Sequence, residues 1–452
     1  MVRCPPARLL RLCFMLTAPV LLFASTHSAE RTKVTLWFWG AVPEYRQALQ
    51  DTLIDPINRR QNKYELVVEY RTSVDNDVRL AAIASGGPDI IFTAGPGNVW
   101  PLARADKLTP MDAYAKRYGW DERLLAPVLN ACRQLGHLYC VTPSLFANGL
   151  FYNKAVLRAN GWELPKTVQQ VEVVMKAAHA KGMYASVTGN KGWQPVNEEY
   201  LSIFMNQMMG PLEVRNLLTG RAAWSSLSQL AAITELDRWY KAGYLGGNDY
   251  FLLDFDGSFA LLSEARSPFF FGPTFALQWA AKYFTGAKAE DLGFAPFPQM
   301  KPELPYPIYD IGSTFTLSIN ANSHVKDECA EVIDFILSAD FARNIAKLWP
   351  GYWSIPLKDF PRDEGAAGVY KLYYQSLSDI SSAVKRGAFG FNVTTFFPNR
   401  TKESLSQDLE AVWLDEETPR EMLERAGKAF ANEKRRGSVL EDIATPIFDN
   451  QH

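Results

Sequence analysis

The chain has few histidines and cysteines and lacks the motifs of metal and nucleophilic centres. Its 452 residues include five histidines, at positions 27, 137, 179, 324 and 452, which are too dispersed for an H-E-x-x-H zinc motif. No G-x-S-x-G nucleophile elbow occurs. The Gly-rich segment 93–98 lacks the Lys-Ser/Thr of a phosphate-binding loop, which argues against nucleotide binding. We therefore expect no catalytic residue, no metal site and no cofactor.

Long apolar runs are missing beyond the N-terminus. No run of about 20 apolar residues follows residue 29, so no membrane-spanning helix is expected there. Residues 1–29 carry three arginines, an apolar core at 12–23 and small residues at 25–29, the organisation of a cleavable secretory signal peptide. An uncleaved anchor is the alternative, and Pro19 and a core of only about 12 residues disfavour it. A periplasmic protein is the expected product.

Charge of one sign is not in excess either. The formal net charge is −2, and it becomes −5 when residues 1–29 leave with three arginines and no acid. Nucleic acid is therefore not an expected partner. Cys13 is a poor lipidation site because Arg11 puts a charge beside it, so we expect a free protein without a lipid anchor.

The mature chain would keep an odd number of cysteines, Cys132, Cys140 and Cys329. Cys132 and Cys140 flank a turn at Gly136. A three-residue turn would place them opposite one another, close enough for a disulfide. A two-residue turn would place Cys132 opposite Tyr139 instead, so the sequence leaves both arrangements open.

The length predicts two domains, and the first has a clear β-α-β-α-β order. Strands are expected at 33–39, 64–70 and 88–93, and helices at 43–58 and 75–85. This alternation is typical of a parallel sheet whose ligand site lies at the carboxyl ends of its strands. Within the first strand, Trp37 and Trp39 share a face. We expect Trp37 to be core, and Trp39, at the carboxyl end, to face the ligand.

Residues 135–167 are predicted to connect the first domain to a second, separately packed domain. Pro143 cannot donate to a strand ladder and ends the first sheet. A strand at 149–152 then leads to Asn153 and a helix, and Thr167 is placed to cap a further helix reaching residue 180. Near the C-terminus, Thr418 and Glu421 form a capping box.

Five segments carry a resemblance to a known family. They are GGPDIIF at 86–92, LTPMD at 108–112, GLFYNKAVL at 149–157, DLGFAPFP at 291–298 and AEVIDFILS at 330–338. In this order they resemble the extracellular solute-binding proteins of ABC importers, in the carbohydrate class typified by maltose-binding protein. Two departures bear on the ligand site: Val168 stands where the family has Trp, and Thr274 where it often has an aromatic residue.

The resemblance implies an α/β, two-lobed periplasmic-binding-protein fold, each lobe a mainly parallel sheet flanked by helices, joined by a hinge. Lobe 1 would comprise residues 30–141 and 299–348, and lobe 2 residues 142–298 and 349–452. The chain would return to the first sheet at 308–319, and the hinge would lie near 141–146 and 349–351.

The resemblance also implies the function: a monomer that binds a sugar or oligosaccharide between its lobes and delivers it to the membrane permease of an ABC importer. One alternative is a non-sugar solute such as a glycerol phosphodiester. Another is a secreted glycosidase using paired carboxylates, with Asp254, Asp256 or Glu264 as candidates. Asp254 and Asp256 would share one strand face.

Sugar sites combine aromatic faces with carboxylates, amides and arginines, because a sugar presents both C–H surfaces and hydroxyls. Position at the expected cleft selects the candidates, and Phe397 is carried over from the resemblance. The expected ligand-binding residues are Trp39, Glu44, Thr93, Asn98, Phe146, Trp193, Glu199, Tyr200, Thr274, Asp310, Tyr352, Trp353, Phe397 and Arg400.

Overall fold

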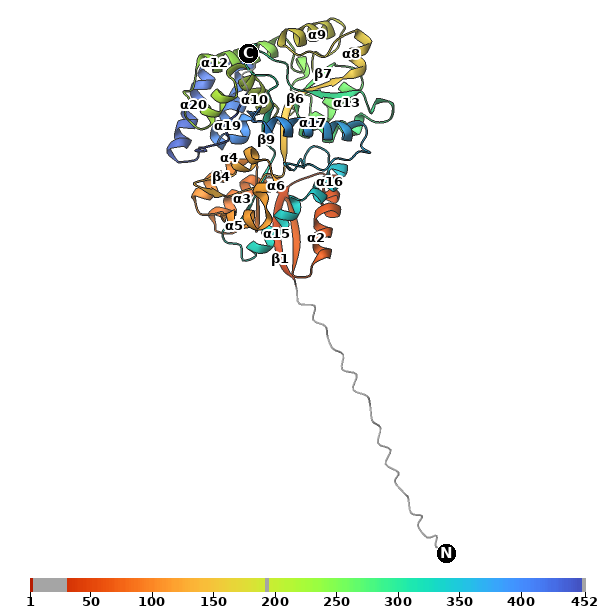
Figure 1. Cartoon of the computed structure of the whole chain (residues 1–452), viewed down its shortest axis with the longest axis vertical. Helices are drawn as coiled ribbons and strands as arrows, with labels where there is room; N and C mark the ends of the chain where they lie inside the picture. The colour runs from red at the N-terminus through yellow and green to blue at the C-terminus, as the bar shows by residue number, and fades with distance from the viewer. Residues whose placement is uncertain (3–30, 192–194, 449–452) are drawn as a thin grey trace.

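The computed structural model describes residues 1–2, 31–191 and 195–448 and shows two lobes, each built around its own sheet (Figure 1). The expected signal peptide lies outside the described residues, apart from its first two. In Figure 1 the red and orange elements form the first lobe together with the cyan helices α15 and α16. The yellow, green and blue elements form the second. The two-lobed α/β class expected from the sequence is confirmed.

The first lobe contains a four-stranded sheet in the order β10-β3-β1-β2. Its strands are β1 (Thr32–Trp39), β2 (Tyr64–Arg71), β3 (Ile90–Thr93) and β10 (Thr316–Ile319). β1 runs parallel to β2 and β3, whereas β10 is antiparallel to β3. The three parallel strands lie where the sequence predicted them.

Helices on both faces of this sheet come from the N-terminal part of the chain and from residues 326–348 (Figure 1). They are α1 (Pro43–Leu49), α2 (Asp55–Arg60), α3 (Val74–Ile83), α4 (Pro96–Arg104), α5 (Asp112–Tyr118), α6 (Trp120–Arg123), α7 (Ala126–Asn130), α15 (Lys326–Ile336) and α16 (Ala339–Leu348). A π-helical turn, Gln50–Ile54, joins α1 to α2.

The faces of β1 correct one expectation. Phe38 is fully buried, whereas Trp37 and Trp39 share the opposite, half-buried face. The Arg71 guanidinium lies 4.0 Å from the centre of the Trp37 ring. Trp37 is therefore not core: its ring is half-buried, and a charged side chain covers it.

The second sheet has β6 (Leu145–Asn153) at its centre. Its other strands are β7 (Phe269–Pro273), β8 (Leu292–Ala295), β9 (Asp310–Ser313) and β11 (Gly390–Phe391). β6 is antiparallel to β7, β8 and β9, and β11 is parallel to β9. Pairing in this sheet is mainly antiparallel, because the central β6 carries the chain away from the crossing while its three neighbours run back toward it. Apart from β6, the strands share one direction, as expected.

Strand pairing also moves two expected lobe boundaries. β9 pairs with β6 in the second sheet, so the return to the first sheet begins only at β10. Residues 349–358 remain with the first lobe: Leu357 bridges to Leu124, and Trp353 stacks on Phe38 with ring centroids 5.7 Å apart. A change of sheet within ten residues, as between β9 and β10, leaves no signature in hydrophobic periodicity.

Helices of the second lobe cover both faces of its sheet (Figure 1). They are α8 (Lys154–Asn160), α9 (Val168–Ala180), α10 (Pro195–Met209), α11 (Pro211–Leu218), α12 (Leu227–Lys241), α13 (Phe255–Ser263), α14 (Leu277–Tyr283), α17 (Gly368–Lys385), α18 (Val393–Phe396), α19 (Asn399–Trp413) and α20 (Pro419–Arg435). Asn153 caps α8, and capping boxes at Thr167 and Thr418 begin α9 and α20, as predicted.

Cys132 and Cys140 form a disulfide, with Cα atoms 5.1 Å apart. The turn between them has two residues, because Gln134 pairs with His137 across it. The two-residue alternative was expected to prevent the bridge, and this is wrong. Cys132 lies opposite Tyr139 but outside the ladder, and so reaches the next residue diagonally.

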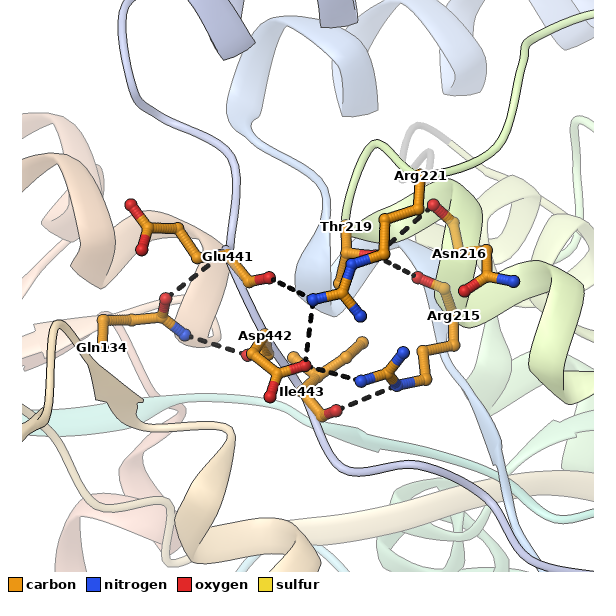
Figure 2. A network of polar contacts seen from close by, with 8 residues as sticks. All are labelled: Gln134, Arg215, Asn216, Thr219, Arg221, Glu441, Asp442 and Ile443. Atoms are coloured by element: carbon orange, nitrogen blue, oxygen red, sulfur yellow. Dashed lines mark hydrogen bonds and ion pairs between the residues drawn. The ribbon is translucent and has the colours of Figure 1, made fainter.

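The C-terminal strap, residues 437–448, contacts both lobes (Figure 2). Asp442 pairs with Arg215 of α11 at 2.5 Å, and its carbonyl oxygen accepts a hydrogen bond from Gln134 of the first lobe at 3.2 Å. Glu441 pairs with Arg104 of α4. The side chain of Ile443, within the strap, is buried. The end of the chain is thus shared between the lobes and does not belong to the second alone.

In the described part of the chain, no helix has the length and apolar character needed to cross a membrane. The same residues contain no cluster of three or more His, Cys, Asp or Glu side chains able to hold a metal ion.

Candidate functional site

A cleft of about 670 Å³ lies between the lobes. The first lobe contributes side chains that follow the carboxyl ends of β1, β2 and β3, together with Tyr352. The second lobe contributes the start of β6, residues at or after the ends of β7, β9 and β11, and charged side chains of α10 and α19. The lining residues are Trp39, Thr72, Ser73, Val74, Asp75, Asn76, Phe92, Ala94, Phe146, Glu198, Glu199, Phe275, Gln278, Trp279, Ser313, Thr314, Tyr352, Asn392, Thr394, Thr395 and Lys402.

Strand direction explains why these segments meet. In an open α/β sheet the carboxyl ends of parallel strands form the edge where loops converge, and ligands bind there. β1, β2 and β3 all end at the cleft. In the second sheet β7, β9 and β11 end there too, and the antiparallel β6 begins there with Phe146.

Aromatic rings line the cleft from both lobes. Trp39 and Tyr352 of the first lobe have ring centroids 5.7 Å apart. In the second lobe Phe146 and Phe275 meet edge to face at 5.1 Å, and Trp279 lies 6.5 Å from Phe275. Rings on both walls can contact both faces of a sugar ring, whose C–H surfaces are apolar.

A buried polar cluster stands behind the second-lobe wall. Asn392 donates a hydrogen bond from Nδ2 to Glu199 Oε2 at 2.7 Å, and Asn148 Nδ2 donates to Asp310 Oδ2 at 2.7 Å. Burial raises the pKa of Asp310 to about 7. Burial, and then the negative charge of Asp310, raise the pKa of Glu199 well above its ordinary value. The cluster therefore resists ionisation at neutral pH.

Charged side chains on the cleft wall are mostly acidic. Asp75 accepts a hydrogen bond from the Ala94 amide at 2.8 Å. Burial raises the pKa of Asp75, and the positive charge of Lys402, on the opposite lobe, acts against this shift. Glu198 and Glu199 are the other acids among the lining residues, and Lys402 is the one base among them.

The structure places four of the predicted residues on the cleft wall: Trp39, Phe146, Glu199 and Tyr352. Trp193 lies outside the described residues. The remaining nine do not line the cleft. They are Glu44, Thr93, Asn98, Tyr200, Thr274, Asp310, Trp353, Phe397 and Arg400.

Four of these nine are held by short-range polar contacts. Thr93 shares a hydrogen bond with Thr316, Oγ1 to Oγ1, at 2.6 Å. Asn98 donates to the Ala94 carbonyl, and Tyr200 to that of Thr188. Thr274 Oγ1 accepts from the Ala147 amide. These polar atoms are thus used by contacts within the fold. Asp310 is buried and accepts a hydrogen bond from Asn148.

The other four are core or surface residues. Trp353 is fully buried against Phe38. Phe397 packs on Trp224, with ring centroids 5.6 Å apart. Glu44 and Arg400 are exposed. These residues were selected because they lie next to a strand end or in a turn. Such a position does not predict the direction of the side chain.

Several lining residues were missed by sequence reasoning. Asp75 and Asn76 follow β2, and Phe275 and Trp279 follow β7, so the strand-end rule that selected Trp39 could have found them. Asn392, Thr395 and Lys402 enter from the C-terminal half, and no local pattern marks them.

The carboxylates considered for glycosidase chemistry are not paired across the cleft. Asp254 is the N-cap of α13 and accepts from the Gly257 amide. Asp256 lies in the first turn of that helix, where it contacts Lys282 at 3.0 Å and the Tyr283 hydroxyl at 2.8 Å. The expected shared strand face is wrong, because this segment is helical. Neither carboxylate, nor Glu264, lines the cleft.

Solved structures with this fold are abundant. A chitin oligosaccharide binding protein superposes with a TM-score of 0.74 at 17% identity, covering 89% of this chain and 100% of its own. A second structure, described under xylan utilization by Caldanaerobius polysaccharolyticus, superposes with a TM-score of 0.76 at 18% identity. The match covers 88% of this chain and 99% of that one. The maltose/maltodextrin-binding domain MalE from Bdellovibrio bacteriovorus, bound to maltotriose, superposes with a TM-score of 0.66 at 14% identity. The match covers 89% of this chain and 100% of that one. At such identities the likeness shows the fold.

No curated protein matches the sequence. The model of the bacterial extracellular solute-binding proteins, however, matches residues 44–342. This match spans well over half of the chain and includes most of the segments that line the cleft. The protein therefore belongs to the family of bacterial extracellular solute-binding proteins.

Proposed function

We propose that this protein is the periplasmic sugar-binding component of an ABC importer, exported by the signal peptide at residues 1–29. It binds a sugar or oligosaccharide in the cleft and presents it to the membrane permease as a monomer. The observation that carries the proposal is the cleft wall itself, which combines aromatic rings from both lobes with amides, hydroxyls and carboxyl groups. This is the mixture that a sugar requires.

The volume of the cleft supports the same ligand class. About 670 Å³ lies within the range of small-molecule sites and accommodates an oligosaccharide of a few rings. The chitin-oligosaccharide and maltotriose binders share the fold and favour the carbohydrate class.

A glycerol phosphodiester is the weaker candidate. Phosphate sites use arginine, lysine or the amides of a helix N-terminus. Here three acids, Asp75, Glu198 and Glu199, face a single Lys402 among the lining residues. An anion would meet mainly like or uncharged groups.

The test is a ligand panel on the purified mature protein. Maltotriose, xylotriose, chitotriose and glycerophosphoglycerol are compared by thermal shift and calorimetry. A bound sugar should stabilise the protein by about 2.7 kcal/mol at ~100 times its dissociation constant. Chromatography should recover the sugar intact. Binding of the phosphodiester alone would contradict this proposal, and so would cleavage of the sugar.

A further inference from the structure

The second-lobe wall of the cleft contains four buried polar side chains from four separate elements. Glu199 comes from α10, Asn148 from β6 and Asp310 from β9, and Asn392 is the N-cap of α18. All four are at most 5% exposed, and Glu199 and Asn392 reach the cleft surface. The chain therefore buries two carboxyl groups beside a ligand site.

The hydrogen bonds of this cluster are one donor short. Asn148 uses Nδ2 on Asp310, and Asn392 uses Nδ2 on Glu199. Asn392 Oδ1 accepts from Thr394 and Thr395. Asn148 Oδ1 is buried and has no hydrogen-bond donor among the described residues. A buried carbonyl oxygen without a donor is destabilising, so the cluster needs one further hydrogen-bond donor.

A proton on the carboxyl pair would supply that donor. An ionised carboxylate only accepts hydrogen bonds, whereas a carboxylic acid donates one. Asn148 Nδ2 donates to Asp310 Oδ2 at 2.7 Å, and hydrogen bonding by the Asn148 side chain lowers the pKa of both Glu199 and Asp310, which only partly offsets the larger effect of burial. One retained proton would also remove the repulsion between two buried negative charges.

The surrounding charges favour retention of the proton. Glu198, on the same helix, adds to the raised pKa of Glu199. Asp75 faces the cleft from the first lobe, and α19 contributes Lys402 at the cleft and Glu410, which accepts hydrogen bonds from Asn190 and Asn197. Strand β7 and helix α18 carry no titratable side chain. Among the described residues that line the cleft, the acids Asp75, Glu198 and Glu199 thus outnumber the one base, Lys402.

Resting on the sugar-binding role proposed above, we propose that Glu199 is a specificity-determining residue that meets the ligand as an uncharged carboxylic acid, its proton held jointly with Asn148 and Asp310. With its proton donated within the cluster, Glu199 offers a sugar hydroxyl an uncharged oxygen that accepts a hydrogen bond. Loss of the proton places an unshared negative charge on the wall. Binding is therefore linked to protonation, and affinity falls when the proton leaves.

The first test needs no ligand. Infrared spectra of the mature protein at neutral pH should show the carbonyl stretch of a protonated carboxylic acid. This band should weaken in Glu199→Gln, in which Asp310 can still carry a proton, and it should vanish in wild type on alkaline titration. Glu198→Gln, which changes the adjacent carboxylate, is the matched control and should keep the band. Absence of the band in the wild type, or a band of undiminished intensity in Glu199→Gln, overturns the proposal.

The second test follows binding of whichever of maltotriose, xylotriose and chitotriose binds most tightly, over the pH range in which the band disappears. Wild-type affinity should fall about tenfold per pH unit once the proton is lost. Glu199→Gln should remove this slope, and Asp256→Asn, outside the cleft, should retain it. An unchanged slope in Glu199→Gln refutes the inference even if sugars bind. If no sugar binds, the sugar-binding role and the ligand role of Glu199 both fail. The infrared band then tests separately whether the cluster holds a proton.

Discussion

The indole ring of Trp39 lies 5.7 Å from the phenol ring of Tyr352, centroid to centroid, at the first-lobe wall of the cleft. The two residues are more than 300 positions apart in the chain, and both belong to the first lobe. Tyr352 stacks in turn on Trp349 at 4.5 Å, which fixes one side of its ring. A ligand would therefore meet a preorganised aromatic surface.

Truncation of Trp39 should weaken sugar binding and spare the fold. We expect Trp39→Ala to lose about 2 kcal/mol of binding free energy, or roughly 30-fold in affinity, as for an aromatic anchor. Phe38→Ala, one residue away but fully buried, should instead lose about 3–5 kcal/mol of folding stability. Calorimetry and urea unfolding of both variants separate the roles. Normal binding by Trp39→Ala would remove this residue from the site.

Trp37→Ala should cost less than a core truncation. Its ring is half-buried and covered by the Arg71 guanidinium at 4.0 Å, so the lost packing and cation–π contact amount to about 1–2 kcal/mol. Urea unfolding measures the change. A loss as large as that of Phe38→Ala would mean that Trp37 is core after all.

Stability should fall as pH rises through the range in which Asp310 ionises. Its pKa is about 7 in the folded protein, against an ordinary 3.8, so between these values the folded state binds more protons than the unfolded state. The free energy of unfolding then decreases from about pH 4 to about pH 7 and levels off above. Asp310→Asn should flatten this part of the profile. Asp256→Asn, at a surface ion pair, should leave it in place.

The disulfide should stabilise the protein modestly. Cys132 and Cys140 are eight residues apart, and closing so short a loop contributes about 2.5 kcal/mol in the chain-entropy model. Urea unfolding of Cys132→Ser/Cys140→Ser against wild type measures it. Thiol titration of the denatured, unreduced mature protein should find only Cys329, whereas three reactive thiols would contradict the bridge.

The C-terminal strap should contribute through Asp442 more than through Glu441. Asp442→Ala leaves the buried Arg215 guanidinium without its carboxylate, which should cost about 1–2 kcal/mol of folding stability. Glu441→Ala breaks a surface pair with Arg104 and should cost less than about 1 kcal/mol. Equal effects in urea unfolding would show that the strap is not anchored at Arg215.

The sequence by itself determined the features that depend on neighbours along the chain. The alternation of strands and helices in residues 32–93, the capping boxes at Thr167 and Thr418, and the exit of β1 at Trp39 each follow from a local period or a local hydrogen bond. The family resemblance rests on short segments of the same kind, and the family match confirms it.

Only the tertiary structure decided which residues share the cleft and the buried cluster. Glu199, Asn148, Asp310 and Asn392 come from four elements, and Lys402 faces the cleft from the lobe opposite Asp75. The direction of β6, the lobe to which residues 349–358 belong and the diagonal approach of Cys132 to Cys140 were settled in the same way. Periodicity reports which face of its own element a residue occupies, whereas a site between two lobes depends on how the elements are placed against one another.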